Sequence, residues 1–187
     1  MNYEKIKKKN LGGFTLIEIL TSIAIFSLIA GGASGVFISA IRAQRKSLSN
    51  QELLSQTSYL MEYMSRTIRM AKKDTEGTCI SSGLNYDITR DGEGIKFLNY
   101  NGICQEFYLS GDRLKEEKSG ITLDLISSSL KVESFNIGPK DSWDQWDNEQ
   151  PRVTFFLKIK GAGEKAELQP EIQIQTTISQ RNLDTQY

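Results

Sequence analysis

The chain of 187 residues contains no histidine. Histidine is the commonest general base and metal ligand in proteins, so its absence excludes a Ser-His-Asp triad and weakens the case for a transition-metal site. The sequence also lacks a glycine-rich phosphate-binding loop of a known pattern. These absences predict that the protein is not an enzyme.

Proline is scarce, with three residues in the chain and none between Phe14 and Lys73. Because proline breaks helices, its absence permits one helix of about 60 residues, roughly 90 Å long. We expect this helix to stop near Gly77. Its second half has apolar residues at steps of three and four, which predicts a face packed on a core: Leu53, Leu54, Thr57, Leu60, Met61, Met64, Ile68 and Ala71.

Charge is almost absent from Phe14 to Ala40, where Glu18 is the only charged side chain. This run of about 27 residues exceeds the roughly 20 that a helix needs to span a bilayer. The first 13 residues carry four lysines and one glutamate, which favours a cytoplasmic N-terminus and leaves the rest of the chain with a net charge of −3. We therefore predict no nucleic-acid partner.

Two other interpretations of the apolar run are a secretory signal peptide, cleaved near Ala30-Gly31-Gly32-Ala33, and an uncleaved signal anchor. The run is too long for the apolar region of a signal peptide, and it contains Glu18. A carboxylate near the bilayer centre opposes insertion by about 2.5–3.5 kcal/mol. Glu18 therefore calls for a partner of opposite charge.

The segment Gly13-Phe14-Thr15-Leu16-Ile17-Glu18 resembles the processing site of type IV pilins and of the pseudopilins of type II secretion. The resemblance implies that a prepilin peptidase cuts after Gly13 and N-methylates Phe14. It also implies that Glu18 compensates the terminal amine of a neighbouring copy inside a filament. Many pilins have a proline within this helix, where the present chain has Gly31, Gly32 and Gly35.

The same resemblance implies the partners and the location of the protein. The partners are other pilin or pseudopilin subunits, the prepilin peptidase, assembly platform proteins and the membrane. The chain would first cross the inner (cytoplasmic) membrane once, with its N-terminus in the cytoplasm. It would then enter an extracytoplasmic filament.

Beyond residue 94 the apolar residues alternate as in strands. Asn101-Gly102 predicts a hairpin turn, and a bulge is expected near Ser134. The sequence thus predicts an α+β fold, a long helix followed by an antiparallel sheet of four to six strands, and the pilin resemblance implies that the helix packs on that sheet. Strands are expected at 94–100, 103–109, 113–117, 130–137, 153–159 and 172–178, turns at 87–94, and either strand or loop at 121–126.

Four parts are expected along the chain: a leader at 1–13, a transmembrane and assembly helix at 14–41, its amphipathic continuation at 42–76, and a globular sheet domain at 77–187. The last part contains the only two cysteines, Cys79 and Cys104. In an exported domain these allow one disulfide, whose loop of about 25 residues would contribute roughly 3 kcal/mol. Two unrelated free thiols are the alternative.

The loop at 138–150 is rich in acidic and aromatic residues. Its carboxylates could surround a Ca²⁺ ion, which takes six to eight oxygen ligands, and some pseudopilins bind calcium in a comparable loop. Its tryptophans, Trp143 and Trp146, could form a recognition surface or fold back on the sheet. No other cofactor is predicted. The calcium candidates are Asp141, Asp144, Asp147 and Glu149.

These patterns together predict a structural minor subunit, a minor pilin or pseudopilin, of a type IV pilus-like filament. The alternative is a single-pass, membrane-anchored extracytoplasmic binding module that does not polymerise and binds its ligand with the tryptophan loop. The state of the N-terminus distinguishes the two, because only a filament subunit would begin with a methylated Phe14.

Overall fold

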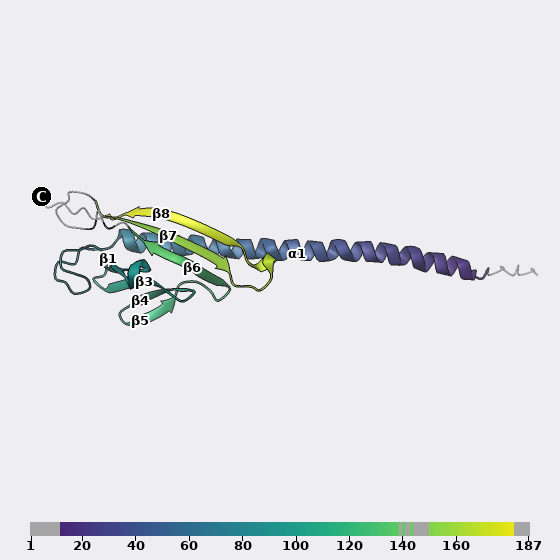
Figure 1. Ribbon diagram of the computed structural model, residues 1–187, viewed down its shortest axis with the longest axis horizontal. Coiled ribbons are helices and arrows are strands. Elements are labelled where there is room, and N and C mark those ends of the chain that lie inside the picture. The colour runs from purple at the N-terminus through teal and green to yellow at the C-terminus, as the bar shows by residue number, and fades with distance from the viewer. Residues whose placement is uncertain (1–11, 139, 141–142, 144–149, 182–187) are drawn as a thin grey trace, which may run out of the picture. The chain divides into compact units, whose positions relative to one another are not determined.

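The computed structural model describes residues 12–138, 140, 143 and 150–181. The chain forms two compact units, Met1–Ala43 and Gln44–Tyr187. One helix, α1 (Leu16–Arg69), contributes its first half to one unit and its second half to the other. All the strands of the described residues belong to the second unit (Figure 1).

The helix ends at Arg69, earlier than the sequence predicts. The backbone N–H of Lys72 donates to the carbonyl oxygen of Leu98 at 2.8 Å, so the chain has already left the helix to form a bridge with a strand. Gly77 lies further along, in the loop that follows, where its φ is +73°. The helix therefore ends where the chain forms a hydrogen bond to a strand, and not at a glycine cap.

The second half of α1 buries the predicted apolar stripe. Leu54 is an exception, because its side chain is 53% exposed although the sequence placed it with the buried residues. A helix rotates by about 100° per residue, so Leu54 points away from the narrow face that contains its neighbour Leu53. The buried positions within the helix are Leu53, Thr57, Leu60, Met64 and Ile68.

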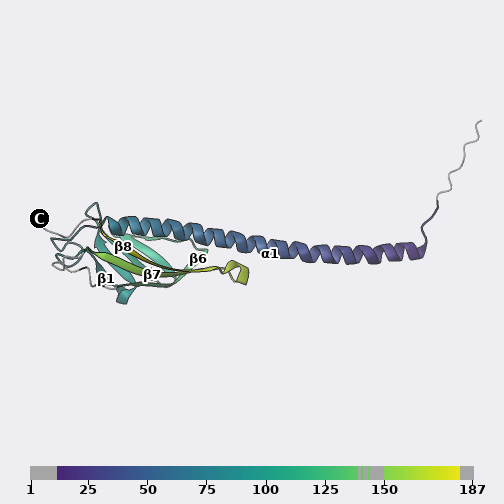
Figure 2. The ribbon, with the colours of Figure 1, turned by 90° about the horizontal axis from the view of Figure 1, so that it is seen from above.

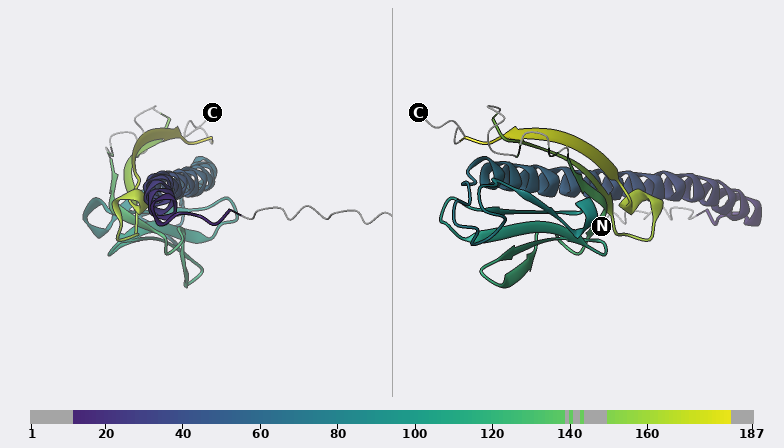
Figure 3. Two further views of the ribbon diagram at one scale, coloured as in Figure 1. Left: turned by 90° about the vertical axis from the view of Figure 1, so that its right-hand side faces the viewer. Right: turned by 60° about the vertical axis from the view of Figure 1, so that its left-hand side comes forward.

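The strands form two antiparallel sheets, which confirms the α+β class. The five-stranded sheet has the order β1 (Asp87–Thr89), β2 (Gly94–Leu98), β3 (Cys104–Ser110), β4 (Arg113–Lys118), β5 (Ile121–Asp124). The three-stranded sheet has the order β6 (Leu130–Ile137), β7 (Arg152–Gly161), β8 (Glu171–Ser179). Both sheets lie alongside the second half of α1 (Figures 2 and 3).

The expectation of a single sheet is wrong, and the connection between β5 and β6 gives the reason. Ser127 donates its backbone N–H to Gln56 Oε1 at 3.0 Å, and Ser129 Oγ donates to Glu52 Oε1 at 2.5 Å. These bonds attach the connection to α1 before β6 begins. The chain therefore starts a second sheet instead of extending the first.

Two local features of the strands agree with the sequence-based predictions, and one short strand was not predicted. The β2–β3 hairpin turns at Asn99–Ile103, and the register of β6 shifts between Val132 and Ser134, as a bulge requires. The segment expected to form only turns contains the short strand β1, followed by a 3₁₀ turn at Arg90–Gly92. A strand of three half-buried residues is too short to produce a periodic pattern.

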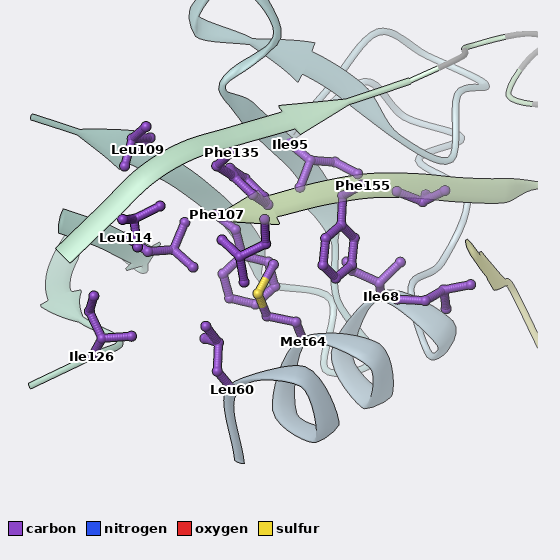
Figure 4. Close-up of a cluster of buried hydrophobic side chains, with 14 of the residues drawn as sticks. Leu60, Met64, Ile68, Ile95, Phe107, Leu109, Leu114, Ile126, Phe135 and Phe155 are labelled. Atoms are coloured by element: carbon purple, nitrogen blue, oxygen red, sulfur yellow. The ribbon is translucent and has the colours of Figure 1, made fainter. Parts of the chain in front are cut away.

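The core of the second unit lies between α1 and the two sheets. Figure 4 shows Leu60, Met64 and Ile68 of the helix pointing toward aromatic side chains of both sheets. Phe107 belongs to the five-stranded sheet, and Phe155 belongs to the three-stranded sheet; both are fully buried. The helix therefore joins the two sheets through one shared hydrophobic cluster.

Candidate processing and assembly segment

The segment before α1, residues 12–15, has no regular secondary structure and is exposed. A Cβ atom added to Gly12 or Gly13 would meet no atom within 4 Å. Nothing in the fold around these residues therefore requires glycine. A requirement for glycine at either position would come from a molecule that acts on this segment.

Thr15 begins the helix. Its side-chain oxygen Oγ1 accepts a hydrogen bond from the backbone N–H of Glu18 at 3.3 Å, and its carbonyl oxygen accepts one from Ile19. Thr15 and Glu18 have the spacing of a capping box, in which a Thr satisfies one of the free amides of the first turn. The sequence reasoning overlooked this cap, which the pattern Thr-x-x-Glu could have revealed.

Glu18 lies in the first turn of α1, with its side chain exposed. The positive end of the helix dipole favours a carboxylate at this position. Among the described residues, no lysine or arginine forms an ion pair with Glu18. A cationic partner for this carboxylate would therefore come from outside the described chain.

The first half of α1 exposes its large apolar side chains, including Phe26 at 72% and Phe37 at 65%, and Phe14 just before the helix is 78% exposed. This half is long and apolar enough to cross a membrane. Its hydroxyl groups suit such a setting, because Ser22, Ser27 and Ser34 donate to helix carbonyls four residues earlier. The surface is therefore adapted to lipid or to other apolar helices.

Gly31, Gly32 and Gly35 lie inside α1, which continues through them without interruption. A Cβ at any of the three would meet no atom within 4 Å in this chain. Small residues on an apolar helix allow the backbone of a second helix to approach closely. These positions form an open strip on the same helix that presents Glu18.

The structure joins Cys79 and Cys104 in a disulfide, with Cα atoms 5.2 Å apart. The bond connects the start of β3 to a loop that is folded around the buried carboxylate of Asp74. Both cysteines lie in the second unit, separate from the N-terminal motif. Their bond holds the strand-rich part together rather than contributing to the processing segment.

Trp143 is 2% exposed, and its indole N–H donates to the carbonyl oxygen of Arg152 at 2.7 Å. Its ring contacts that of Tyr86, with centroids 5.6 Å apart. The interpretation of Trp143 as an exposed recognition residue is therefore wrong, because its indole is inside the core. Trp146 and the calcium candidates Asp141, Asp144, Asp147 and Glu149 lie outside the described residues.

Comparison with known families identifies the N-terminal segment. The family model for the prokaryotic N-terminal methylation motif matches residues 8–34. Neither a search of curated proteins nor a search of solved structures found a match. The chain thus carries a prepilin-type N-terminal methylation motif followed by a long apolar helix, which is consistent with the type IV pilin family and with membrane anchoring.

Proposed function

We propose that this protein is a structural minor subunit, a minor pilin or pseudopilin, of a type IV pilus-like filament. The methylation motif at residues 8–34, which extends into the exposed apolar first half of α1, is the observation that supports this function most strongly. We assign a minor rather than a major subunit because the strand-rich part is irregular and divided into two sheets.

In this proposal the lysines of the leader hold the N-terminus in the cytoplasm while α1 crosses the inner membrane. The prepilin peptidase cuts between Gly13 and Phe14 and methylates the new terminal amine. The helix then leaves the lipid with the help of assembly platform proteins and packs against the helices of other subunits. Van der Waals contact, aided by glycines on the helix, replaces contact with lipid.

The pairing of charges explains why an acid is placed in an apolar helix. Glu18 is exposed and forms no ion pair with a described residue, and cleavage creates a cationic amine at Phe14 of each copy. In a water-free filament core, an ammonium and a carboxylate attract strongly, whereas either charge alone would be costly. Glu18 of one copy would therefore pair with the terminal amine of another.

Replacing Gly13 by alanine tests the processing step. We expect Gly13→Ala to keep its leader, because a methyl group beside the scissile bond would obstruct the peptidase, while the fold is unaffected since a Cβ there meets nothing within 4 Å. Mass spectrometry of the N-terminus measures the outcome in cells that contain the peptidase. Wild-type protein should begin with methylated Phe14.

Gly12→Ala is the matched control, since its surroundings in the chain are equally open and it lies one residue further from the cut. This variant should be processed. Mature-length protein from Gly13→Ala would contradict the proposed processing site. A wild-type chain that retains Met1 would instead indicate a membrane anchor that does not polymerise.

A further inference from the structure

An open cavity of about 760 Å³ lies in the second unit, where the end of α1 meets the end of β8. Three arginines line it: Arg66 and Arg69 from the last turn of the helix, and Arg181 from the segment after β8. Ser65, Ser179 and Gln180 also line the cavity. Neither the disulfide nor the N-terminal motif involves this cavity.

The described residues that line the cavity carry more positive than negative charge. Arg66 forms a salt bridge of 3.0 Å with Glu62, which also lines the cavity. Arg69 and Arg181 form no ion pair with any carboxylate among the described residues. Among the described residues, the lining therefore has two positive charges without an ion-pair partner. Like charges around one cavity repel one another, and an anion bound between them would relieve this repulsion.

The backbone fixes the two uncompensated arginines beside each other. The N–H of Arg181 donates to the carbonyl oxygen of Arg69 at 2.8 Å, and the preceding residue is held equally firmly. Gln180 donates its side-chain amide to the carbonyl oxygen of Ala71 at 2.7 Å, and its backbone N–H to Pro151. The backbone around the site is thus in place before any ligand arrives, with the side chains of Arg69 and Arg181 exposed.

A favourable interaction with the helix dipole explains only part of this arrangement. Cations in the last turn of a helix are stabilised by the negative end of the dipole, which accounts for Arg66 and Arg69. Arg181 is not in the helix, and it brings a third guanidinium to a site that already contains two. A ligand that binds Arg69 and Arg181 together would explain its presence.

We propose that this cavity binds a dianionic tetrahedral oxyanion of the phosphate monoester class. The planar guanidinium group of arginine matches two oxygens of such an anion at once. A phosphate monoester carries about −1.5 to −2 charges near neutral pH, which balances the two uncompensated arginines, whereas a diester or a carboxylate carries only one. The ligand is inorganic phosphate or a phosphate monoester on a sugar or lipid.

The test is a calorimetric titration of the processed full-length chain in detergent with inorganic phosphate. We expect saturable binding to the wild type and a loss of affinity of at least about tenfold in Arg69→Gln/Arg181→Gln, because two charge-assisted pairs are removed. The affinity of Arg69→Lys/Arg181→Lys should lie between those of the wild type and the glutamine variant. Lysine keeps the positive charge but lacks the planar guanidinium group that can bind two oxygens at once. Both side chains are exposed, and an unchanged urea unfolding midpoint would show that the variants fold.

The matched control is Lys131→Gln/Lys165→Gln, which makes the same change of net charge at residues that do not line the cavity. It should bind phosphate like the wild type. Titrations with dimethyl phosphate, a monoanion, should give weaker binding than inorganic phosphate. Glucose 6-phosphate and vesicles containing phosphatidic acid then distinguish a soluble source of the monoester from a lipid source.

Three results would overturn the proposal. The first is the absence of phosphate binding by the wild type. The second is an equal loss of affinity in the arginine and lysine double variants, which would indicate general charge attraction. The third is equal affinity for inorganic and dimethyl phosphate, which would exclude a dianion site.

Discussion

The carboxylate of Asp74 shows how a single buried acid organises a loop. It accepts hydrogen bonds from the backbone N–H groups of Gly77, Thr78, Cys79 and Ile80 at 2.6 to 3.1 Å. Burial by itself raises the pKa of Asp74, but these four amides outweigh it and lower the pKa from 3.8 to about 2. The folded state therefore favours the ionised form.

Asp74→Asn should lower the free energy of unfolding at pH 7 by about 2 kcal/mol, because the charge that accepts these hydrogen bonds is lost. Since the folded pKa is below the unfolded one, this stabilisation is present above pH 4 and is lost as the pH falls toward 2. The difference between wild type and variant should shrink over that range. Urea unfolding followed by tryptophan fluorescence measures it.

Glu76→Gln is the control for Asp74→Asn, because Glu76 lies in the same loop with an exposed side chain. Its unfolding curve should match that of the wild type at each pH. A gap between Asp74→Asn and wild type that stays constant from pH 7 to pH 2 would contradict the assigned role of the ionised carboxylate.

At the scale of elements, regular patterns within short stretches were predictable, whereas contacts between distant residues were not. The stripe of α1, the Asn101-Gly102 hairpin and the strand pattern of β7 each depend on neighbours in the sequence. The split into two sheets depends on Gln56 and Ser127, which a sequence pattern does not connect. The loop around Asp74 also had no periodic signal.

Two leucines of α1 test how narrow its buried face is. Leu60→Ala should lower the free energy of unfolding by about 2–5 kcal/mol, since Leu60 is 1% exposed and its removal leaves a cavity. Leu54→Ala makes the same chemical change at an exposed position and should cost less than about 0.5 kcal/mol. Equal losses in urea unfolding experiments would show that Leu54 packs on the core.

At the scale of the whole molecule, the two units are stabilised differently. Gln44–Tyr187 has its own core, in which helix and sheets cover one another, whereas the described part of Met1–Ala43 leaves most of its large apolar side chains exposed. The proposed processing and assembly residues Gly13, Phe14 and Glu18 lie in one short segment, so a local sequence pattern was enough to suggest them. Arg69 and Arg181 are separated by most of the chain, and only the fold brings them together.

Glu18→Gln tests the proposed assembly of the molecule with other copies. The change keeps the shape of the side chain and removes its charge, so the variant should insert into the membrane more easily and still be processed. Without the carboxylate, the terminal amine of a neighbour would remain unpaired in a water-free filament core, which costs several kcal/mol. We expect the variant to accumulate in the membrane, and immunoblots of sheared filaments and membranes measure the distribution.

The control for this experiment is Glu167→Gln, which removes one negative charge from a 3₁₀ turn in the second unit, Ala166–Leu168, and should enter filaments like the wild type. A combined measurement of N-terminal mass separates failed assembly from failed processing. If Glu18→Gln were cleaved and recovered in sheared filaments at the wild-type level, the pairing of Glu18 with a neighbouring amine would not drive assembly. The apolar surface of the helix would then have to supply the specificity of subunit contact by itself.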